Sequence, residues 1–271
     1  MFSEGDDTLD LNTVADLATY PDTLSQDALG GDDTVTLSGT AKLGVAFHGG
    51  EGNDYITGSS GDDFLYGDED NDRILGGGGD DALDGGEGDD RLAGGSGNDL
   101  LLGGVGTDQL DGGADDDTIN GNDGHDIVFG GSGNDQINTG VGDDIVDGGS
   151  GNDTLIDDSG ANTLRGGEGN DTIQTRGGDD LIYGGAGSDT IRLGGGNDIV
   201  VLETGIGFDT IQGFSLGSTK FGVTSTSDLS FTGSRSGTNV FLNGDQIAFV
   251  AGVQSSVLSN NVGNVFVTSG F

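Results

Sequence analysis

The chain has 271 residues with 48 acidic and 8 basic side chains, so its formal net charge is −40. Glycine contributes 59 residues and hydrophobic residues only 31%, so apolar burial alone is not expected to fold the chain before its carboxylates are neutralised. Nucleic acid is excluded as a partner, because its phosphates would face a strongly anionic surface. The absence of cysteine excludes disulfides and thiolate metal sites.

Neither a membrane-spanning segment nor a cleavable secretion signal is expected. No run approaches the ~18 apolar residues that cross a bilayer. Residues 1–7, MFSEGDD, carry neither a basic nor an apolar stretch, so no cleavable N-terminal signal is predicted.

Residues 1–48 are predicted to form an N-terminal cap. They contain two degenerate copies of a glycine–aspartate motif, Gly5-Asp6-Asp7-Thr8-Leu9 and Gly31-Asp32-Asp33-Thr34-Val35. The stretch between them, 11–29, is poorer in glycine and is compatible with one helical turn or a loop. His48 and His125 are expected to lie in exposed loops rather than to act as catalytic groups.

From Gly49 to Val201 the sequence divides into 17 consecutive blocks of nine residues without an insertion. Gly85-Gly86-Glu87-Gly88-Asp89-Asp90-Arg91-Leu92-Ala93 is representative. Position eight is Ile, Leu or Val in all 17 blocks, position six is Asp in 16 and Asn162 in the other, and position four is Gly in 15. Glycines at positions one, two and four suit a tight turn. One branched aliphatic residue between two variable ones suits a short strand with one buried face.

Two nonapeptides, with one strand on each of two facing sheets, make an 18-residue coil of a parallel solenoid. The 17 repeats therefore correspond to about 8–9 coils. We predict an all-β protein, a right-handed parallel β-roll (β-solenoid), with the position-eight residues from Ile56 to Val200 as its core. In this interpretation 49–201 forms the roll, between the flanking segments 1–48 and 202–271.

In an 18-residue coil the position-six residues form two columns. Carboxylates about 5 Å apart in a column repel each other, so cations are expected between the rungs; a solvated acidic face is the alternative. Oxygen donors favour Ca²⁺ over Mg²⁺, which needs a strict octahedron, and over Zn²⁺ or copper, which need softer or imidazole ligands. The candidate carboxylate ligands are Asp54, Asp63, Asp72, Asp81, Asp90, Asp99, Asp108, Asp117, Asp126, Asp135, Asp144, Asp153, Asp171, Asp180, Asp189, Asp198 and Asp209.

The period Gly-Gly-x-Gly-x-Asp followed by an aliphatic residue resembles the RTX (repeats-in-toxin), or haemolysin-type, calcium-binding nonapeptide repeats. The resemblance implies that each Ca²⁺ takes main-chain oxygens of positions two and four and the Asp from one turn. Oxygens of positions one and three and the next Asp come from the turn 18 residues further on. One implied site combines Gly77, Gly79 and Asp81 with Gly94, Ser96 and Asp99. The implied main-chain ligands over the array are Gly77, Gly79, Gly86, Gly88, Gly94, Gly95, Ser96, Gly97, Gly103, Gly104, Val105, Gly106, Gly112, Gly113, Ala114, Gly130, Gly131, Ser132, Gly133, Gly148, Gly149, Ser150, Gly151, Gly166, Gly167, Glu168, Gly169, Gly184, Gly185, Ala186 and Gly187.

The gaps between rungs allow at most 15 ions, eight in one column and seven in the other. Departures from the motif are concentrated in the column that contains Asp54, where Asp68, Asp70, Asn122, Thr139 and Leu193 replace motif residues. Asn162 cannot contribute a charge, and Arg176 adds a cation. The sites around residues 157–178 are therefore expected to be weak or empty.

Residues 202–271 are predicted to hold a last degenerate repeat, 204–211, and an antiparallel β cap. Asn243-Gly244, between the apolar runs 239–242 and 246–250, predicts a two-residue hairpin. The family resemblance implies an uncleaved type I secretion signal at the C-terminus, and hence the type I secretion apparatus as a partner. A plain structural cap is the alternative.

No His-Glu-x-x-His, Gly-x-Ser-x-Gly or Gly-Lys-Ser/Thr motif is present, so the chain is not predicted to be an enzyme. We predict a secreted, extracellular calcium-binding protein that folds when it binds several Ca²⁺ ions outside the cell, with a structural, surface or matrix role. The alternative is a non-catalytic module of a secreted toxin or extracellular hydrolase. A monomer is compatible with the sequence, which does not determine the oligomeric state.

Overall fold

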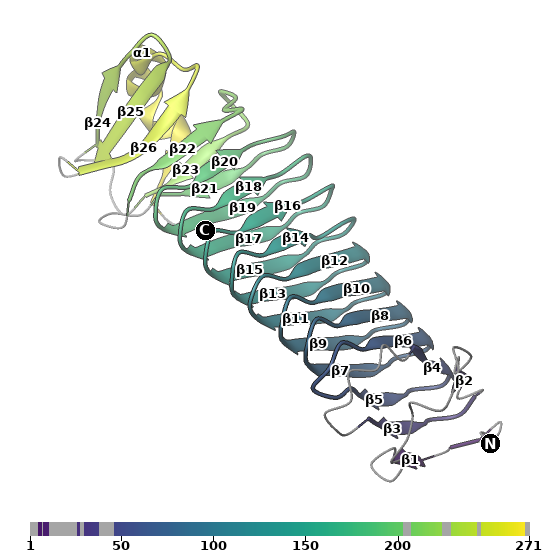
Figure 1. The fold of residues 1–271 in the computed structure, drawn as a ribbon. Coiled ribbons are helices and arrows are strands. Elements are labelled where there is room, and N and C mark those ends of the chain that lie inside the picture. Colours follow the sequence, from purple (N-terminus) through teal and green to yellow (C-terminus); the bar gives the residue numbers. More distant parts are fainter. Residues whose placement is uncertain are drawn as a thin grey trace. The chain divides into compact units, whose positions relative to one another are not determined.

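The computed structural model describes residues 5–6, 8–10, 26–27, 30–37, 46–202, 207–223, 229–242 and 245–268. The chain divides into two compact units, Met1–Val141 and Gly142–Phe271. Each unit is built mainly of short strands stacked in parallel (Figure 1). No helix among the described residues is long and apolar enough to cross a membrane.

In the N-terminal unit, successive strands alternate between two sheets. The first sheet contains β1 (Thr8–Asp10), β3 (Thr34–Thr36), β5 (Tyr55–Thr57), β7 (Arg73–Gly78), β9 (Arg91–Ser96), β11 (Gln109–Ala114) and β13 (Ile127–Ser132). The second contains β2 (Gln26–Asp27), β4 (Ala46–Glu51), β6 (Phe64–Glu69), β8 (Ala82–Glu87), β10 (Leu100–Val105), β12 (Thr118–Asp123) and β14 (Gln136–Asn138). Within the regular repeats, partners are 18 residues apart, as in Ile74 with Leu92 and Leu83 with Leu101. The predicted 18-residue coil and parallel β-solenoid are confirmed.

The core of each unit lies between its two sheets and is made by position eight. Because alternate residues of a strand face opposite sides, position eight points inward while positions seven and nine point outward. All position-eight side chains from Ile56 to Val200 are at most 2% exposed. A turn-plus-strand unit therefore buries one aliphatic side chain, and stacking extends this into a continuous ladder.

The degenerate N-terminal copies continue the same parallel pairing. Val35 of β3 aligns with Leu9 of β1 on one side and with Ile56 of β5 on the other. Within the stretch expected to hold a helical turn or a loop, β2 is a strand, and 11–25 and 28–29 lie outside the described residues.

The expectation that His48 lies in an exposed loop is wrong. His48 is on strand β4, and its ring stacks on that of Tyr66 with centroids 4.4 Å apart. Its Nδ1 lies 3.0 Å from Oδ2 of Asp68. The regular strand pattern begins earlier than Gly49, which the block count did not reveal. His125 is exposed in a turn, as expected.

The C-terminal unit continues the alternation. Its first sheet contains β15 (Ile145–Ser150), β17 (Thr163–Glu168), β19 (Leu181–Ala186), β21 (Ile199–Val201), β23 (Lys220–Gly222) and β27 (Phe266–Val267). Its second contains β16 (Thr154–Ile156), β18 (Thr172–Gln174), β20 (Thr190–Arg192), β22 (Asp209–Gln212), β26 (Asp245–Ala251), β25 (Gly237–Leu242) and β24 (Leu229–Gly233).

The antiparallel strands predicted near the C-terminus are confirmed. Strands β25 and β26 pair with Leu242 opposite Asp245, as a hairpin requires, and β24 pairs antiparallel with β25. The turn residues 243–244 lie outside the described residues. The segment is not purely antiparallel, because β26 pairs in parallel with β22 and β27 with β23.

Two short helices precede β27 and were not expected from the sequence. They are α1 (Ser255–Asn260) and α2 (Val262–Val265). Each buries one aliphatic side chain, Leu258 and Val265, at most 1% exposed. Helices this short depend on such packing rather than on their intrinsic propensity.

Candidate metal centre

The position-six residues form two buried stacks, one at each turn between the sheets. Within the array all of them, from Asp54 to Asp198 and including Asn162, are at most 3% exposed. The alternative of a solvated acidic face is therefore wrong for this position. A buried carboxylate must be hydrogen-bonded and charge-compensated, or it protonates.

One oxygen of most of these carboxylates links neighbouring coils. The backbone N–H of Asp81 donates to Oδ1 of Asp99 at 2.8 Å, and the N–H of Asp99 donates to Oδ1 of Asp117 at 2.8 Å. The same bond joins Asp54 to Asp72 at 2.8 Å and Asp171 to Asp189 at 2.8 Å. Position six therefore stabilises the stacking of the coils before any ion is considered.

The second oxygen, Oδ2, is buried without a hydrogen-bond partner in ten of these aspartates. They are Asp54, Asp72, Asp81, Asp90, Asp99, Asp108, Asp117, Asp171, Asp180 and Asp189. A native protein leaves few buried polar atoms unsatisfied. Ten equivalent acceptors at the same repeat position indicate a common ligand other than a hydrogen-bond donor of the protein.

Main-chain carbonyl oxygens lie close to these orphaned atoms. A Cβ atom placed on Gly76 would be 2.4 Å from Oδ2 of Asp81 and 2.7 Å from the carbonyl oxygen of Gly94, so both oxygens border one small space. The carbonyl oxygens of Gly77 and Gly79 face the next coil, 2.2 and 2.0 Å from the Cβ positions of Gly95 and Gly97.

In most repeats the residues at positions two and four have a left-handed backbone. Gly77 and Gly79 have φ of 110° and 108°, and Gly95 and Gly97 have 113° and 118°. Four non-glycine residues at these positions keep the conformation: Asp68, Asp70, Asp115 and Asn122 have φ between 72° and 79°. Asp and Asn tolerate this region better than most residues, so these departures from the motif preserve the turn. Ser59, Asp158 and Arg176, at position two of other turns, do not have a positive φ.

The oxygens brought together fit a hard cation such as Ca²⁺, which takes six to eight oxygen ligands including carbonyls. The implied partners Gly77, Gly79 and Asp81 meet Gly94 and Asp99 at one junction between coils. The carbonyl of Ser96 accepts a hydrogen bond from the N–H of Gly79 at 2.9 Å, which leaves it one lone pair. No group of three His, Cys, Asp or Glu side chains suited to a metal occurs in the described part of the chain, so any ion there depends on main-chain oxygens.

Burial raises the pKa of the position-six carboxyls in the metal-free fold. The pKa of Asp72 rises to about 8, and that of Asp81, Asp117 and Asp171 to about 7, chiefly through desolvation and partly through the neighbouring aspartates. Backbone N–H donation opposes the rise but does not cancel it. An adjacent divalent cation would favour the ionised form instead.

These shifts predict a pH dependence for the metal-free protein. A carboxyl whose pKa is raised from 3.8 to about 7 or 8 stabilises the fold below pH 4 and loses that contribution as the pH rises through its folded value. With excess chelator, we expect β structure, measured by far-ultraviolet circular dichroism on cleared samples, to be greater at pH 4 than at pH 8. With saturating Ca²⁺ the order reverses, because protons compete with the ion. Equal signals at both pH values in chelator would contradict this.

Four turns of one column differ from all the others at position one. Instead of glycine they carry Thr139, Asp157, Thr175 and Leu193, each at most 9% exposed. The space that glycine leaves open elsewhere is thus filled by a side chain. Asn162, in the second of these turns, accepts the N–H of Asp144 at 2.6 Å through Oδ1, but its buried Nδ2 has no hydrogen-bond partner. An amide N–H₂ in place of Oδ2 repels a cation rather than binding it.

Arg176 does not enter this column. Its guanidinium forms an ion pair with Asp158 of the preceding coil, and both side chains are partly exposed. The expectation of weak or empty sites at 157–178 thus rests on the filled positions and on Asn162 rather than on Arg176.

Position five, which the motif leaves variable, forms a second ladder of hydrogen bonds. The Oδ1 atom of Asp80 accepts the N–H of Asn98 at 2.9 Å, and Oδ1 of Asn98 accepts the N–H of Asp116 at 3.0 Å. This ladder runs in the opposite direction to that of position six and lies at the surface. The frequent Asp or Asn at position five is the sequence feature from which this ladder could have been predicted.

Together these features define a class of protein, a parallel β-solenoid whose glycine turns stack buried carboxylates against main-chain oxygens. Comparison with family models matches the RTX calcium-binding nonapeptide repeat to residues 48–83, 84–119, 120–155, 156–191, 165–200 and 175–211. The matches span more than half of the chain, which therefore belongs to the RTX calcium-binding nonapeptide-repeat family. A search of curated proteins finds no matching relative.

Proposed function

We propose that this protein is a secreted calcium-binding protein that holds Ca²⁺ ions between successive coils of each unit and folds when they bind. The observation that carries the proposal is the set of buried, unpartnered Oδ2 atoms beside main-chain oxygens. Ion binding contributes directly to folding where no site exists in the unfolded chain. Extracellular modules bind Ca²⁺ with Kd of about 10⁻⁴–10⁻³ M, so the chain stays unfolded in calcium-poor cytosol and folds outside.

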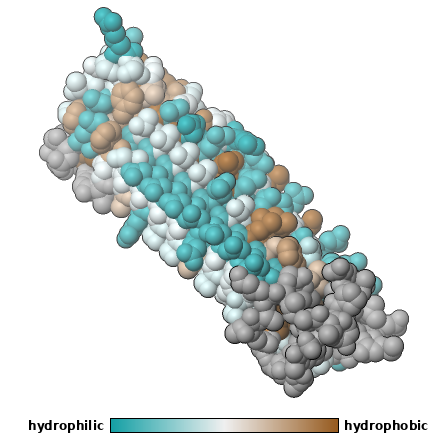
Figure 2. Space-filling model, in the orientation of Figure 1, coloured by the Kyte–Doolittle hydropathy of each residue, from teal (hydrophilic) through white to brown (hydrophobic). Residues whose placement is uncertain are grey.

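After folding, the proposed role is structural, at a cell surface or in an extracellular matrix, following export through a type I apparatus. Many outward side chains are polar, and Figure 2 shows a mainly hydrophilic or neutral face with scattered apolar patches. A calcium-dependent pull-down from extracellular material tests this role. Capture of a toxin or hydrolase subunit in its place would favour an accessory module.

The metal proposal is tested by comparing the same substitution, Asp to Asn, at buried position six and at exposed position five. Asp99→Asn keeps the acceptor for the N–H of Asp81 but removes the charge and puts an amide at Oδ2. We expect it to lower the number of ions bound in equilibrium dialysis and to cost about 3–5 kcal/mol of unfolding free energy in Ca²⁺, since a buried charge partner is lost. Asp80→Asn, the same change at exposed position five, is expected to alter stability by less than about 0.5 kcal/mol. An unchanged ion count in Asp99→Asn would refute the proposal.

A second pair tests which column of the C-terminal unit holds ions. Asp171 and Asp180 are both buried with an unpartnered Oδ2, but Asp171 follows Gly166 and Asp180 follows Thr175. We propose that, in this unit, only the column that contains Asp171 binds Ca²⁺. Asp171→Asn is then expected to reduce the ion count, whereas Asp180→Asn leaves it unchanged. Equal losses would show that both columns are occupied.

A further inference from the structure

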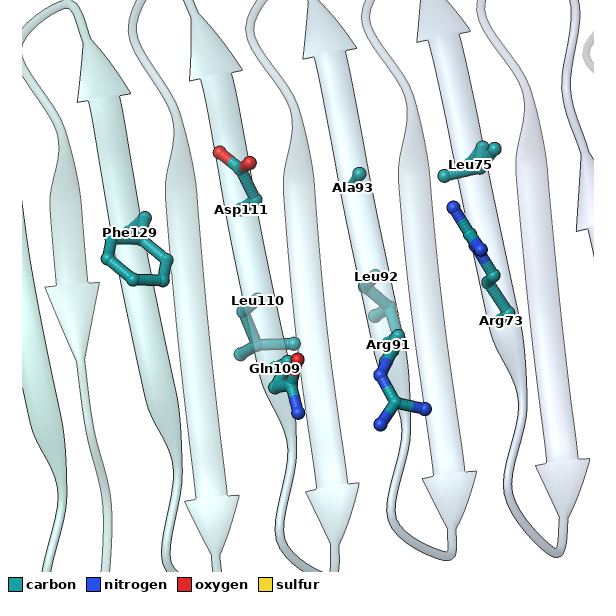
Figure 3. Close-up of a pocket in the computed structure, with 9 residues that line it drawn as sticks. All are labelled: Arg73, Leu75, Arg91, Leu92, Ala93, Gln109, Leu110, Asp111 and Phe129. Atoms are coloured by element: carbon teal, nitrogen blue, oxygen red, sulfur yellow. The ribbon is translucent and has the colours of Figure 1, made fainter.

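A hollow lies on the outward face of the first sheet in the N-terminal unit, far from the chemistry of the turns. It forms where Ala93, whose side chain is a single methyl group, stands in register between the larger Leu75 and Asp111. Figure 3 shows these side chains in one row, with Phe129 beyond Asp111. The cavity, which we call the Ala93 hollow, has a volume of about 280 Å³.

Two arginines border the Ala93 hollow at position seven of neighbouring strands. Arg73 and Arg91 are in register on β7 and β9. The guanidinium of Arg73 lies 5.4 Å from the ring centroid of Tyr55, a weak cation–π contact at an exposed site. In Figure 3 Arg73 runs along its strand toward Leu75, whereas Arg91 extends away from Ala93. Both side chains are exposed, and exposed side chains change rotamer within nanoseconds.

The two arginines at the hollow are neighbouring cations without a carboxylate partner. Among the ion pairs of the described residues, neither Arg73 nor Arg91 has a carboxylate within 4.0 Å, and Asp111 pairs with neither. Most described Lys and Arg residues lack an ion pair, but these two also lie in register on adjacent strands. Two neighbouring cations without a counter-ion repel each other, and an external anion would relieve this. Guanidinium groups bind carboxylates with two parallel hydrogen bonds.

The floor and one wall of the hollow are apolar. Ala93 and Leu75 provide aliphatic surface, and Phe129 is 48% exposed, so its ring is available to a ligand. Asp111 repels an anion on its own side, so a charged group is favoured at the arginine side and an uncharged ring near Phe129. We propose that the Ala93 hollow binds a small aromatic carboxylate, with its charge at Arg73 and Arg91 and its ring over Ala93. This site is independent of the proposed calcium function.

The test is a titration of the full, ¹⁵N-labelled chain with benzoate, in saturating Ca²⁺ and 0.15 M salt, where distant carboxylates are screened beyond about 8 Å. Amide shifts at Ala93 and Phe129 should saturate with a Kd in the millimolar range, as expected for so small a ligand. Benzyl alcohol, the uncharged analogue, should bind at least tenfold more weakly. Equal binding of the two, or shifts confined to the turns, would overturn the proposal. The same spectra report folding, so failure here is distinguishable from failure to bind calcium.

Variants separate the charge from the shape of the hollow. The double variant Arg73→Gln with Arg91→Gln is expected to weaken benzoate binding at least tenfold, because charge-assisted hydrogen bonds are lost. Ala93→Leu fills the space and should abolish the shift at Phe129 while both arginines remain. Matched controls are Arg165→Gln, an arginine stacked on Tyr183 in the other unit, and Ala82→Leu on the second sheet. Unchanged binding in the double variant, or an equal loss in the controls, would refute the assignment.

Discussion

Excess chelator at neutral pH is expected to unfold most of the chain, with loss of the β signal in circular dichroism and collapse of amide shift dispersion. The fold places its position-six carboxylates in columns where burial, with a smaller contribution from neighbouring aspartates, raises the pKa of Asp54, Asp90, Asp99 and Asp108 to about 6. Ionising them in the metal-free fold therefore costs free energy at pH 7. The net charge of −40 adds self-repulsion. Aliphatic residues at position eight supply the core, but the burial of one side chain per nonapeptide offsets only a small part of the conformational entropy that nine residues lose on folding.

Readdition of metal provides the control for this experiment. Millimolar Ca²⁺ should restore the spectrum, whereas Mg²⁺ at the same concentration should not, because it keeps its waters and demands a small octahedron. Salt at matched ionic strength tests whether screening alone suffices. A chain that keeps full β structure in chelator at pH 7.5, or that refolds in NaCl alone, would show that bound ions do not hold the coils together.

The solenoid could be predicted from the sequence because its period is also its structural unit. Position eight is aliphatic in every block, so the burial of Ile56 to Val200 follows from the strand period of two together with the repeat of nine. The degenerate copies at 5–9 and 31–35 were identified by the same motif, although the pairing of β1 with β3 and of β3 with β5 depended on contacts that the period does not give. Helices α1 and α2 follow no repeat, and their packing through Leu258 and Val265 is a tertiary effect.

The sequence predicted which aspartates stack in the turns, but not the different roles of their two carboxylate oxygens. Sequence spacing placed Asp81 and Asp99 one coil apart, but it does not reveal that Oδ1 accepts a backbone N–H and only Oδ2 remains for an ion. The position-five ladder was missed because the motif leaves this position variable, although most repeats carry Asp or Asn there. The side chains of Thr139, Asp157, Thr175 and Leu193 looked like loss of the motif, whereas the structure buries all four at the same repeat position of successive coils.

Gly94→Ala is expected to be among the most damaging single substitutions, for a steric reason. A Cβ at Gly94 would lie 2.3 Å from Oδ2 of Asp99 and 2.8 Å from its Cβ and Cγ, so the carboxylate must leave its place. Asp99 would then lose its bond with the N–H of Asp81 and its contribution to the junctions on both sides. We expect a loss of about 3–5 kcal/mol in the denaturant unfolding of the calcium-loaded protein, with fewer ions bound. Gly195→Ala is the control, since nothing lies within 4 Å of its Cβ position; it should change stability by less than about 0.5 kcal/mol.

A double-mutant cycle distinguishes this clash from a general intolerance of alanine in the turn. If Gly94→Ala acts by expelling the Asp99 side chain, Asp99→Gly already removes every atom that clashes, its Cβ included, and the double variant should be no less stable than Asp99→Gly alone. The interaction energy would then nearly equal the full effect of Gly94→Ala, since the two residues are in contact. Additive losses would show that Gly94 is needed for its backbone conformation. The carboxylate would then not be the group for which a position-one glycine leaves room.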